Sequence, residues 1–138
     1  MTDLHLPNDT LILIATGEEA KLYRQHGAHL KQEEHWTPHN LADEGPSGKS
    51  PSEQSDRESM EATFSKQLAE RLYNYAHKGK FENFVLIADP ETLGEMRPLL
   101  HKEVSDKILL EMNKTLINAP LPDIEESIAA ARKYKITD

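Results

Sequence analysis

The stretch Phe84–Arg97 constrains the fold of this 138-residue chain more than any other part of the sequence. It opens with Phe84–Ala88, an apolar run without polar alternation, and such runs are typical of strands that are covered on both faces of a sheet. Asp89 and Pro90 follow. Aspartate commonly caps the start of a helix, and proline fits the first helical position. We therefore predict a buried central strand that leads through a tight turn into a helix.

Pro98 limits the length of that helix. Inside a helix, proline lacks the N–H that would bond to the carbonyl of Gly94, and its ring collides with that carbonyl. The residue before proline is also pushed away from helical geometry. We expect a kink or an end of the helix near Arg97.

A second apolar run, Thr10–Thr16, resembles the first and is predicted to be its neighbour in the sheet. Two half-polar runs follow, Ala20–Gln25 and Leu30–Trp36, with a turn at Gly27 between them. Two extended runs joined by a short glycine turn are typical of an antiparallel hairpin. The chain is therefore expected to open with three consecutive strands.

The rest of the chain alternates helices and strands. Apolar residues recur every four positions in 59–78, which predicts an amphipathic helix that ends at Gly79. Residues 108–116 are expected to form a strand and residues 123–133 a closing helix. The order βββαβαβα predicts an α/β fold of ribonuclease-H-like order, a mixed five-stranded sheet with helices on its faces.

We expect residues 1–138 to form a single α/β domain, because the length is that of one ordinary domain. Residues 37–57 are rich in proline, glycine and serine, and we expect a flexible loop there. Long loops in small domains are either functional or disordered. Both alternatives stay open for this segment.

The charge and composition exclude some classes of function and disfavour others. The formal net charge of −8 opposes non-specific attraction to nucleic acid and to anionic membranes. No cysteine is present, so thiolate metal sites and cysteine nucleophiles are excluded. The early apolar run Leu11–Ala15 is too short for a signal peptide or a membrane span. A cytoplasmic location is expected.

Several pieces of the sequence resemble the host attachment protein family, small bacterial proteins named for a presumed role in attachment to host cells. The strand Val85–Ala88 with Asp89, the motif Leu-Gly-x-x-Arg at Leu93–Arg97, Phe81, and the opening segment Leu11–Tyr23 carry the resemblance. That family is similar in turn to the middle domain of archaeal and eukaryotic peptide-chain release factors. The resemblance implies a translation-linked ancestry.

The sequence departs from these relatives in two places. The release-factor domain works through a Gly-Gly-Gln loop, and this tripeptide does not occur in the chain. Many attachment proteins place an aspartate after the first strand, where this chain has Thr16. The resemblance therefore implies neither peptidyl-tRNA hydrolysis nor a role for an acid at that position.

The candidate catalytic residues each have a structural explanation. A two-metal nuclease needs several converging carboxylates, and only Asp89 lies at a predicted strand end, where it serves as a helix cap. Asp43–Ser50 ends like a phosphate-binding loop but has aspartate where the pattern requires glycine. Four of the seven histidines form closely spaced pairs, His26 with His29 and His35 with His39. These pairs are expected on a hairpin and in a loop, where their spacing does not fix a metal geometry. We predict no catalytic residue, no metal and no cofactor.

The candidate binding residues are Asp89, Leu93, Gly94, Arg97 and Trp36. Trp36 is the only tryptophan and stands where a strand meets the loop, so it serves either as an exposed anchor or as packing over the sheet edge. Arg97 serves either in binding or in an ion pair with an acid such as Glu91 or Glu95.

Two hypotheses for the function follow from the sequence. The first is a non-catalytic interaction module that binds a protein partner through residues 37–57 and the Leu93–Arg97 corner. The alternative is an RNA-acting hydrolase or ribosome-associated factor. Lys21 and Arg24 alternate onto opposite faces of a strand, so RNA binding is expected to be weak or absent.

Overall fold

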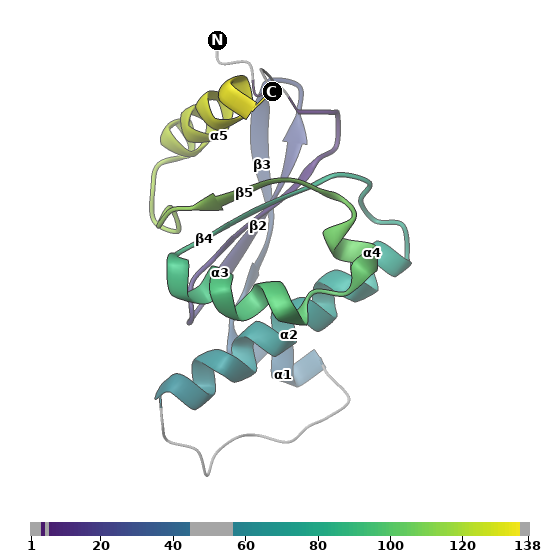
Figure 1. Ribbon diagram of the computed structural model, residues 1–138, viewed down its shortest axis with the longest axis vertical. Helices are drawn as coiled ribbons and strands as arrows, with labels where there is room; N and C mark the ends of the chain where they lie inside the picture. The colour runs from purple at the N-terminus through teal and green to yellow at the C-terminus, as the bar shows by residue number, and fades with distance from the viewer. Residues whose placement is uncertain (1–3, 5, 45–56, 136–138) are drawn as a thin grey trace.

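A five-stranded mixed sheet forms the centre of the computed structural model, which describes residue 4, residues 6–44 and residues 57–135 (Figure 1). The strand order across the sheet is β3-β2-β1-β4-β5. β1 pairs with β2 in antiparallel and with β4 in parallel orientation, β2 and β3 are antiparallel, and β4 and β5 are parallel. The strands are β1 (Leu11–Ala15), β2 (Ala20–His26), β3 (His29–Trp36), β4 (Phe84–Ala88) and β5 (Ile108–Asn113).

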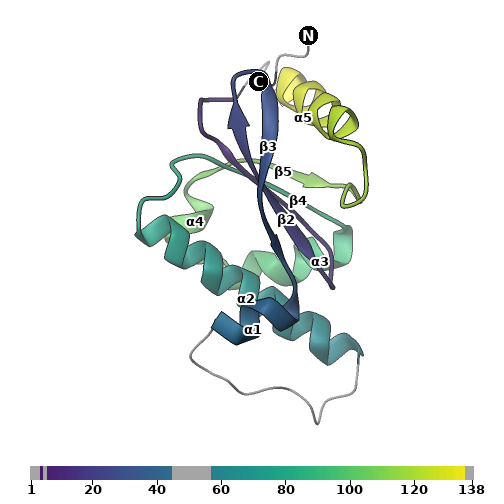
Figure 2. The ribbon, with the colours of Figure 1, turned by 180° about the vertical axis from the view of Figure 1, so that it is seen from behind.

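The helices cover both faces of this sheet. One face is covered by α1 to α4 and the other by α5, as Figures 1 and 2 show from opposite sides. The predicted α/β fold, a mixed five-stranded sheet with helices on its faces, is therefore confirmed. The helices are α1 (Pro38–Glu44), α2 (Arg57–His77), α3 (Pro90–Met96), the 3₁₀ helix η1 (Arg97–Leu99), α4 (Lys102–Ser105) and α5 (Leu121–Lys135).

The parallel pair β1–β4 contributes to two hydrophobic cores at once. Successive strand side chains point to opposite faces, so Leu13 and Leu86 face α2 whereas Ile12 and Val85 face α5. Every residue of both strands is at most 2% exposed. This two-sided burial explains why polar alternation is absent from both runs.

The ends of α2 and α3 follow the sequence signals. Gly79 has a φ of 72°, and the N–H groups of Gly79 and Lys80 donate to the carbonyls of Ala76 and Tyr75, which is the Schellman pattern. α3 ends at Met96, and a 3₁₀ turn that contains Pro98 continues the chain. The expected stop at Gly79 and the expected end near Arg97 are both confirmed.

The expectation of a loop over residues 37–57 is wrong for residues 38–44, which form α1. Thr37 and Asn40 bond reciprocally, because the Asn40 N–H donates to the Thr37 Oγ1 and the Thr37 N–H to the Asn40 Oδ1. Pro38 suits the first helical position, and Leu41 is buried in the core on α2. Residues 45–56 lie outside the described residues, so the prediction stays open there.

None of the helices in the described ranges is long and apolar enough to cross a membrane.

The short helix α4 was not predicted from the sequence. The His101 Nδ1 caps it by accepting a hydrogen bond from the Glu103 N–H, and Val104 anchors it in the core.

Glu125 fastens α5 to the edge strand β3. Its Oε2 accepts a hydrogen bond of 2.9 Å from the Leu30 N–H and lies 3.6 Å from the His29 Nδ1. Glu125 is only 7% exposed, so the carboxylate is removed from most of the water that would otherwise solvate it. It satisfies an edge-strand N–H that would otherwise be buried without a partner.

Replacing Glu125 with alanine should lower the free energy of unfolding by about 1–3 kcal/mol, because the Leu30 N–H loses its acceptor. Denaturant unfolding measures this change. Glu126→Ala is the matched control, since Glu126 is exposed on the same helix and should change stability by less than about 0.5 kcal/mol. Equal effects of the two substitutions would contradict the stabilising role of the hydrogen bond between Glu125 and Leu30.

Candidate functional site

The carboxyl ends of parallel strands are where α/β proteins usually hold their chemistry. At the end of β4, the Asp89 Oδ2 accepts from the Thr92 N–H at 3.1 Å, and the Asp89 Oδ1 accepts from the Thr92 hydroxyl at 2.8 Å. Asp89 is therefore the N-cap of α3, as predicted. Both of its oxygens are used by the protein itself.

The end of β1 is also occupied by local hydrogen bonds. The Thr16 Oγ1 accepts from the N–H groups of Glu18 and Glu19, at 3.1 and 3.2 Å, and so forms the turn between β1 and β2. No carboxylate projects from β1 itself, because all five of its residues are apolar. Within the described ranges, no three His, Asp or Glu side chains gather where they could hold a metal ion.

The residues of the Leu93–Arg97 corner point in different directions. Leu93 is 3% exposed and packs into the core on α2 together with Met96. Gly94 and Arg97 lie on the outer side of the helix, and both are exposed. A Cβ added at Gly94 would meet no atom within 4 Å. The corner therefore presents exposed helix backbone beside a guanidinium group.

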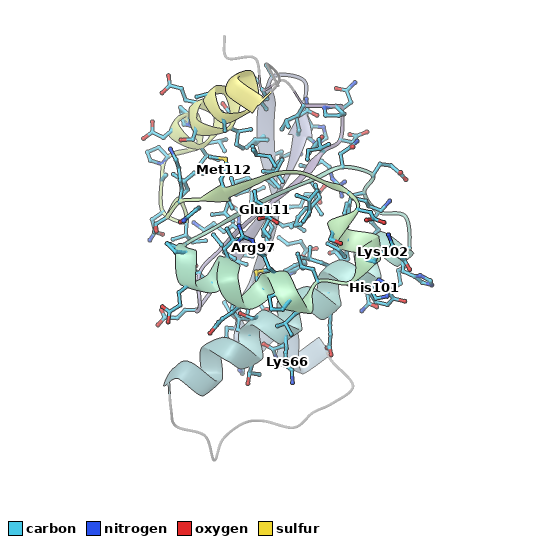
Figure 3. All side chains as sticks on the ribbon, in the orientation of Figure 1. Lys66, Arg97, His101, Lys102, Glu111 and Met112 are labelled. Carbon is cyan, nitrogen blue, oxygen red and sulfur yellow. The ribbon has the colours of Figure 1, made fainter. Side chains whose placement is uncertain are left out.

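Arg97 forms an ion pair with Glu111 on β5, with both its Nε and its Nη2 at 2.8 Å from Glu111 Oε1 (Figure 3). Arg97 therefore forms an ion pair, but its partner is neither of the two acids that we named from the sequence, Glu91 and Glu95. Glu95 instead accepts a hydrogen bond of 3.2 Å from the Ser65 Oγ on α2. The Arg97 side chain remains 56% exposed, so a pair of this kind contributes at most about 1 kcal/mol and leaves the group accessible.

Trp36 lies in the core and not on the surface. It is 3% exposed, and its ring meets the edge of Tyr75 at a centroid distance of 5.6 Å. The Arg71 guanidinium lies 5.5 Å from the indole centroid. Burial, and then the Glu34 carboxylate, raise the pKa of Tyr75, while Arg71 opposes this change. In this position the indole holds β3 against α2, which is the packing alternative stated for it.

Two of the candidate RNA-binding cations lie on opposite faces of β2. The Lys21 Nζ donates to the Ile117 carbonyl on the α5 side. Arg24 donates to the Lys80 carbonyl next to the end of α2 and to the Glu33 carboxylate on β3. The predicted separation of these cations is confirmed. A polar pocket of about 450 Å³ borders Arg24, whose guanidinium is held by these protein acceptors.

A groove between α2 and η1 was not predicted from the sequence. It consists of two neighbouring hollows of about 290 Å³ each, and Lys66 and Leu99 line both. Leu99 is 39% exposed. Leu99 lies in the 3₁₀ turn that contains Pro98, and none of the residues of this turn is buried. Pro98 was the available signal in the sequence. The remaining lining residues are Thr63, Ser65, Ala69, Glu70, Tyr73, Glu95 and His101.

Two solved structures share the fold of this chain. The crystal structure of the archaeal translation termination factor aRF1 is 17% identical with a TM-score of 0.50, and the match covers 92% of this chain and 40% of that one. A structure described as an archaeal protein is 16% identical with a TM-score of 0.52, covering 93% and 37% respectively. The chain thus spans less than half the length of either protein. No curated protein matches the sequence.

The sequence model of bacterial archaeo-eukaryotic release factor family 12 matches residues 9–128, which is most of the chain. The expected likeness to release factors is therefore supported. Nothing in these matches supports the likeness to host attachment proteins. The fold and the sequence together place the chain in bacterial archaeo-eukaryotic release factor family 12.

Proposed function

We propose that this chain is a non-catalytic interaction module that binds a protein partner in a role linked to translation. Membership of a release-factor family and a fold shared with an archaeal termination factor support the link to translation. A cytoplasmic location belongs to the same proposal, because translation takes place there. The chain lacks the Gly-Gly-Gln tripeptide, so its role differs from peptidyl-tRNA hydrolysis.

Gly94 is the observation that carries the binding proposal. Glycine inside a helix costs about 0.5–1 kcal/mol relative to alanine. Gly94 is exposed within α3, its φ is not positive, and a Cβ would have free space around it. Nothing in the described structure therefore requires glycine here. The absence of a side chain is useful instead to a partner that approaches the helix backbone closely.

Arg97 is the polar part of the same surface. Arg97 is the C-cap residue of α3 and follows Gly94 by three positions, so the two residues lie on the same side of the helix. The partially exposed pair of Arg97 with Glu111 offers a cation and an anion to a partner. Such a mixed patch suits a protein surface, whereas phosphates would be repelled by Glu111 and by the net charge of −8. We therefore place the binding surface on Gly94, Arg97 and Glu111.

The proposal that the module is non-catalytic rests on Asp89. A metal-dependent hydrolase needs free carboxylate oxygens, whereas both Asp89 oxygens serve the start of α3. Asp89→Ala should lower the free energy of unfolding by about 0.5–2 kcal/mol, and Asp89→Asn should retain most of the stability because its amide oxygen still accepts from the Thr92 N–H. A magnesium titration should leave the amide shifts around residue 89 unchanged. Magnesium-dependent shifts that disappear in Asp89→Asn would favour the hydrolase.

The binding surface is tested by substitutions at Gly94. Gly94→Ala should raise the free energy of unfolding by roughly 0.5–1 kcal/mol, because the helix gains a better helix former without a clash. Gly94→Gln should also fold, but its side chain blocks close approach of a partner. Tagged wild-type protein incubated with native cytosol should retain a defined set of translation proteins, and Gly94→Gln should lose them.

Ala130→Gln is the matched control, because Ala130 is an exposed helix position on α5. Quantitative mass spectrometry of the retained proteins compares the three baits. The proposal fails if wild type, Gly94→Gln and Ala130→Gln retain the same proteins. It also fails if the proteins that depend on Gly94 have no connection with translation.

A further inference from the structure

The groove between α2 and η1 lies on the other flank of α3 from the proposed partner surface. Arg97 reaches toward β5, where it pairs with Glu111, whereas Glu95 reaches toward α2, where it accepts from Ser65. The Glu95 flank borders the groove, and the Gly94–Arg97 flank does not line it. The two surfaces can therefore be occupied by different molecules and tested separately.

The groove combines an apolar projection with an apolar hollow. Leu99, at 39%, and Leu121, at 37%, are the exposed large apolar residues among the residues that the structure describes. Leu99 lines both hollows, so its side chain stands between them. One hollow is lined by Ala69 and the ring of Tyr73 and has a volume of about 290 Å³. A leucine side chain from another molecule fits such a space.

The charges around the groove also combine both signs. Lys66 lines both hollows, Glu70 borders one, and Glu95 borders the other. Lys66 and Glu70 are exposed, and neither has an ion-pair partner among the described side chains. Figure 3 shows two of the residues that line the groove, Lys66 on α2 and His101 at the start of α4. When two copies of such a surface face each other, the cation of each copy can lie opposite an anion of the other.

We propose that this groove binds a second copy of the chain in a two-fold symmetric dimer. A two-fold contact brings the same patch together on both subunits, so the patch must match itself in shape and in charge. Leu99 of each copy enters the hollow of Ala69 and Tyr73 on the other. Lys66 of each copy then faces Glu70 or Glu95 of the other. The proposal goes beyond the proposed function, which concerns a different partner on a different surface.

Other occupants fit the groove less well. Phosphate groups would meet the carboxylates of Glu70 and Glu95 on either side of Lys66. A small polar ligand needs several convergent polar groups around an enclosed space, and the larger part of this lining is apolar. A second copy uses the exposed leucine, the hollow and both signs of charge.

Sedimentation velocity of the full chain tests the dimer, from roughly 1 μM to 1 mM. Wild-type protein should shift with concentration from the 15.7 kDa monomer toward twice that mass. Leu99→Asp should raise the dissociation constant by at least about tenfold, because a charge replaces the side chain at the centre of the contact. Leu121→Asp is the matched control, an equally exposed leucine at the start of α5, and should leave the constant unchanged.

A charge exchange tests the predicted ion pairs. Lys66→Glu should weaken the dimer, and combining it with either Glu70→Lys or Glu95→Lys should restore it, because the opposite charges again face each other across the two-fold axis. Circular dichroism of each variant should show that these surface substitutions leave the fold intact. Restoration by exchange would not follow from a purely structural effect of the single change.

The inference is overturned by any of three results. Wild-type protein stays monomeric over the whole concentration range, the dimer is as sensitive to Leu121→Asp as to Leu99→Asp, or neither double variant restores association. If the protein is monomeric but still retains translation proteins through Gly94, only the proposed dimer is contradicted. If the protein forms the dimer but has no Gly94-dependent partners, only the proposed function is contradicted.

Discussion

The structure depends on the burial of the parallel pair β1–β4 on both faces. Each residue of the two strands contributes to one of two hydrophobic cores, and none is more than 2% exposed. The sheet cannot gain a polar residue in these strands without losing packing on one side or the other. Helices α2, α3 and α4 must therefore cover one face, and α5 must cover the other, so that the side chains of β1 and β4 are shielded from water.

The same constraint bears on where we propose that the chain binds its partner. Strands that are apolar throughout bring no catalytic side chains into the sheet, and the polar residues just beyond them, Thr16 and Asp89, hold the turns that follow. The proposed function accordingly uses the outer surface of the covering helices. α3 is the clearest case, since Leu93 faces the core while Gly94 and Arg97 face outward on one flank and Glu95 on the other. In the function that we propose, the exposed surface of α3 serves recognition.

The sequence predicted the elements whose signals are local and did not predict contacts that depend on the assembled fold. Phe84–Pro90 was predictable because burial, cap and proline all indicate the same structure. α1 was missed because Asn40 takes the place that glutamate or glutamine usually has in a capping box. The partner of Arg97 was missed because Glu111 is distant in sequence and reaches it only when β5 lies beside β4. The exposure of Leu99 likewise follows from a 3₁₀ turn and not from helical periodicity.

Native-state hydrogen exchange tests the central role of the β1–β4 pair most directly. If both cores depend on this pair, the amides of β1 and β4 exchange only when the whole protein unfolds. Their protection should then equal the free energy of unfolding from denaturant titration, and the hairpin β2–β3 should open at lower cost toward its edge. The account would be contradicted if the amides of β1 or β4 exchanged at a free energy roughly 2 kcal/mol or more below global unfolding while β2 and β3 stayed protected.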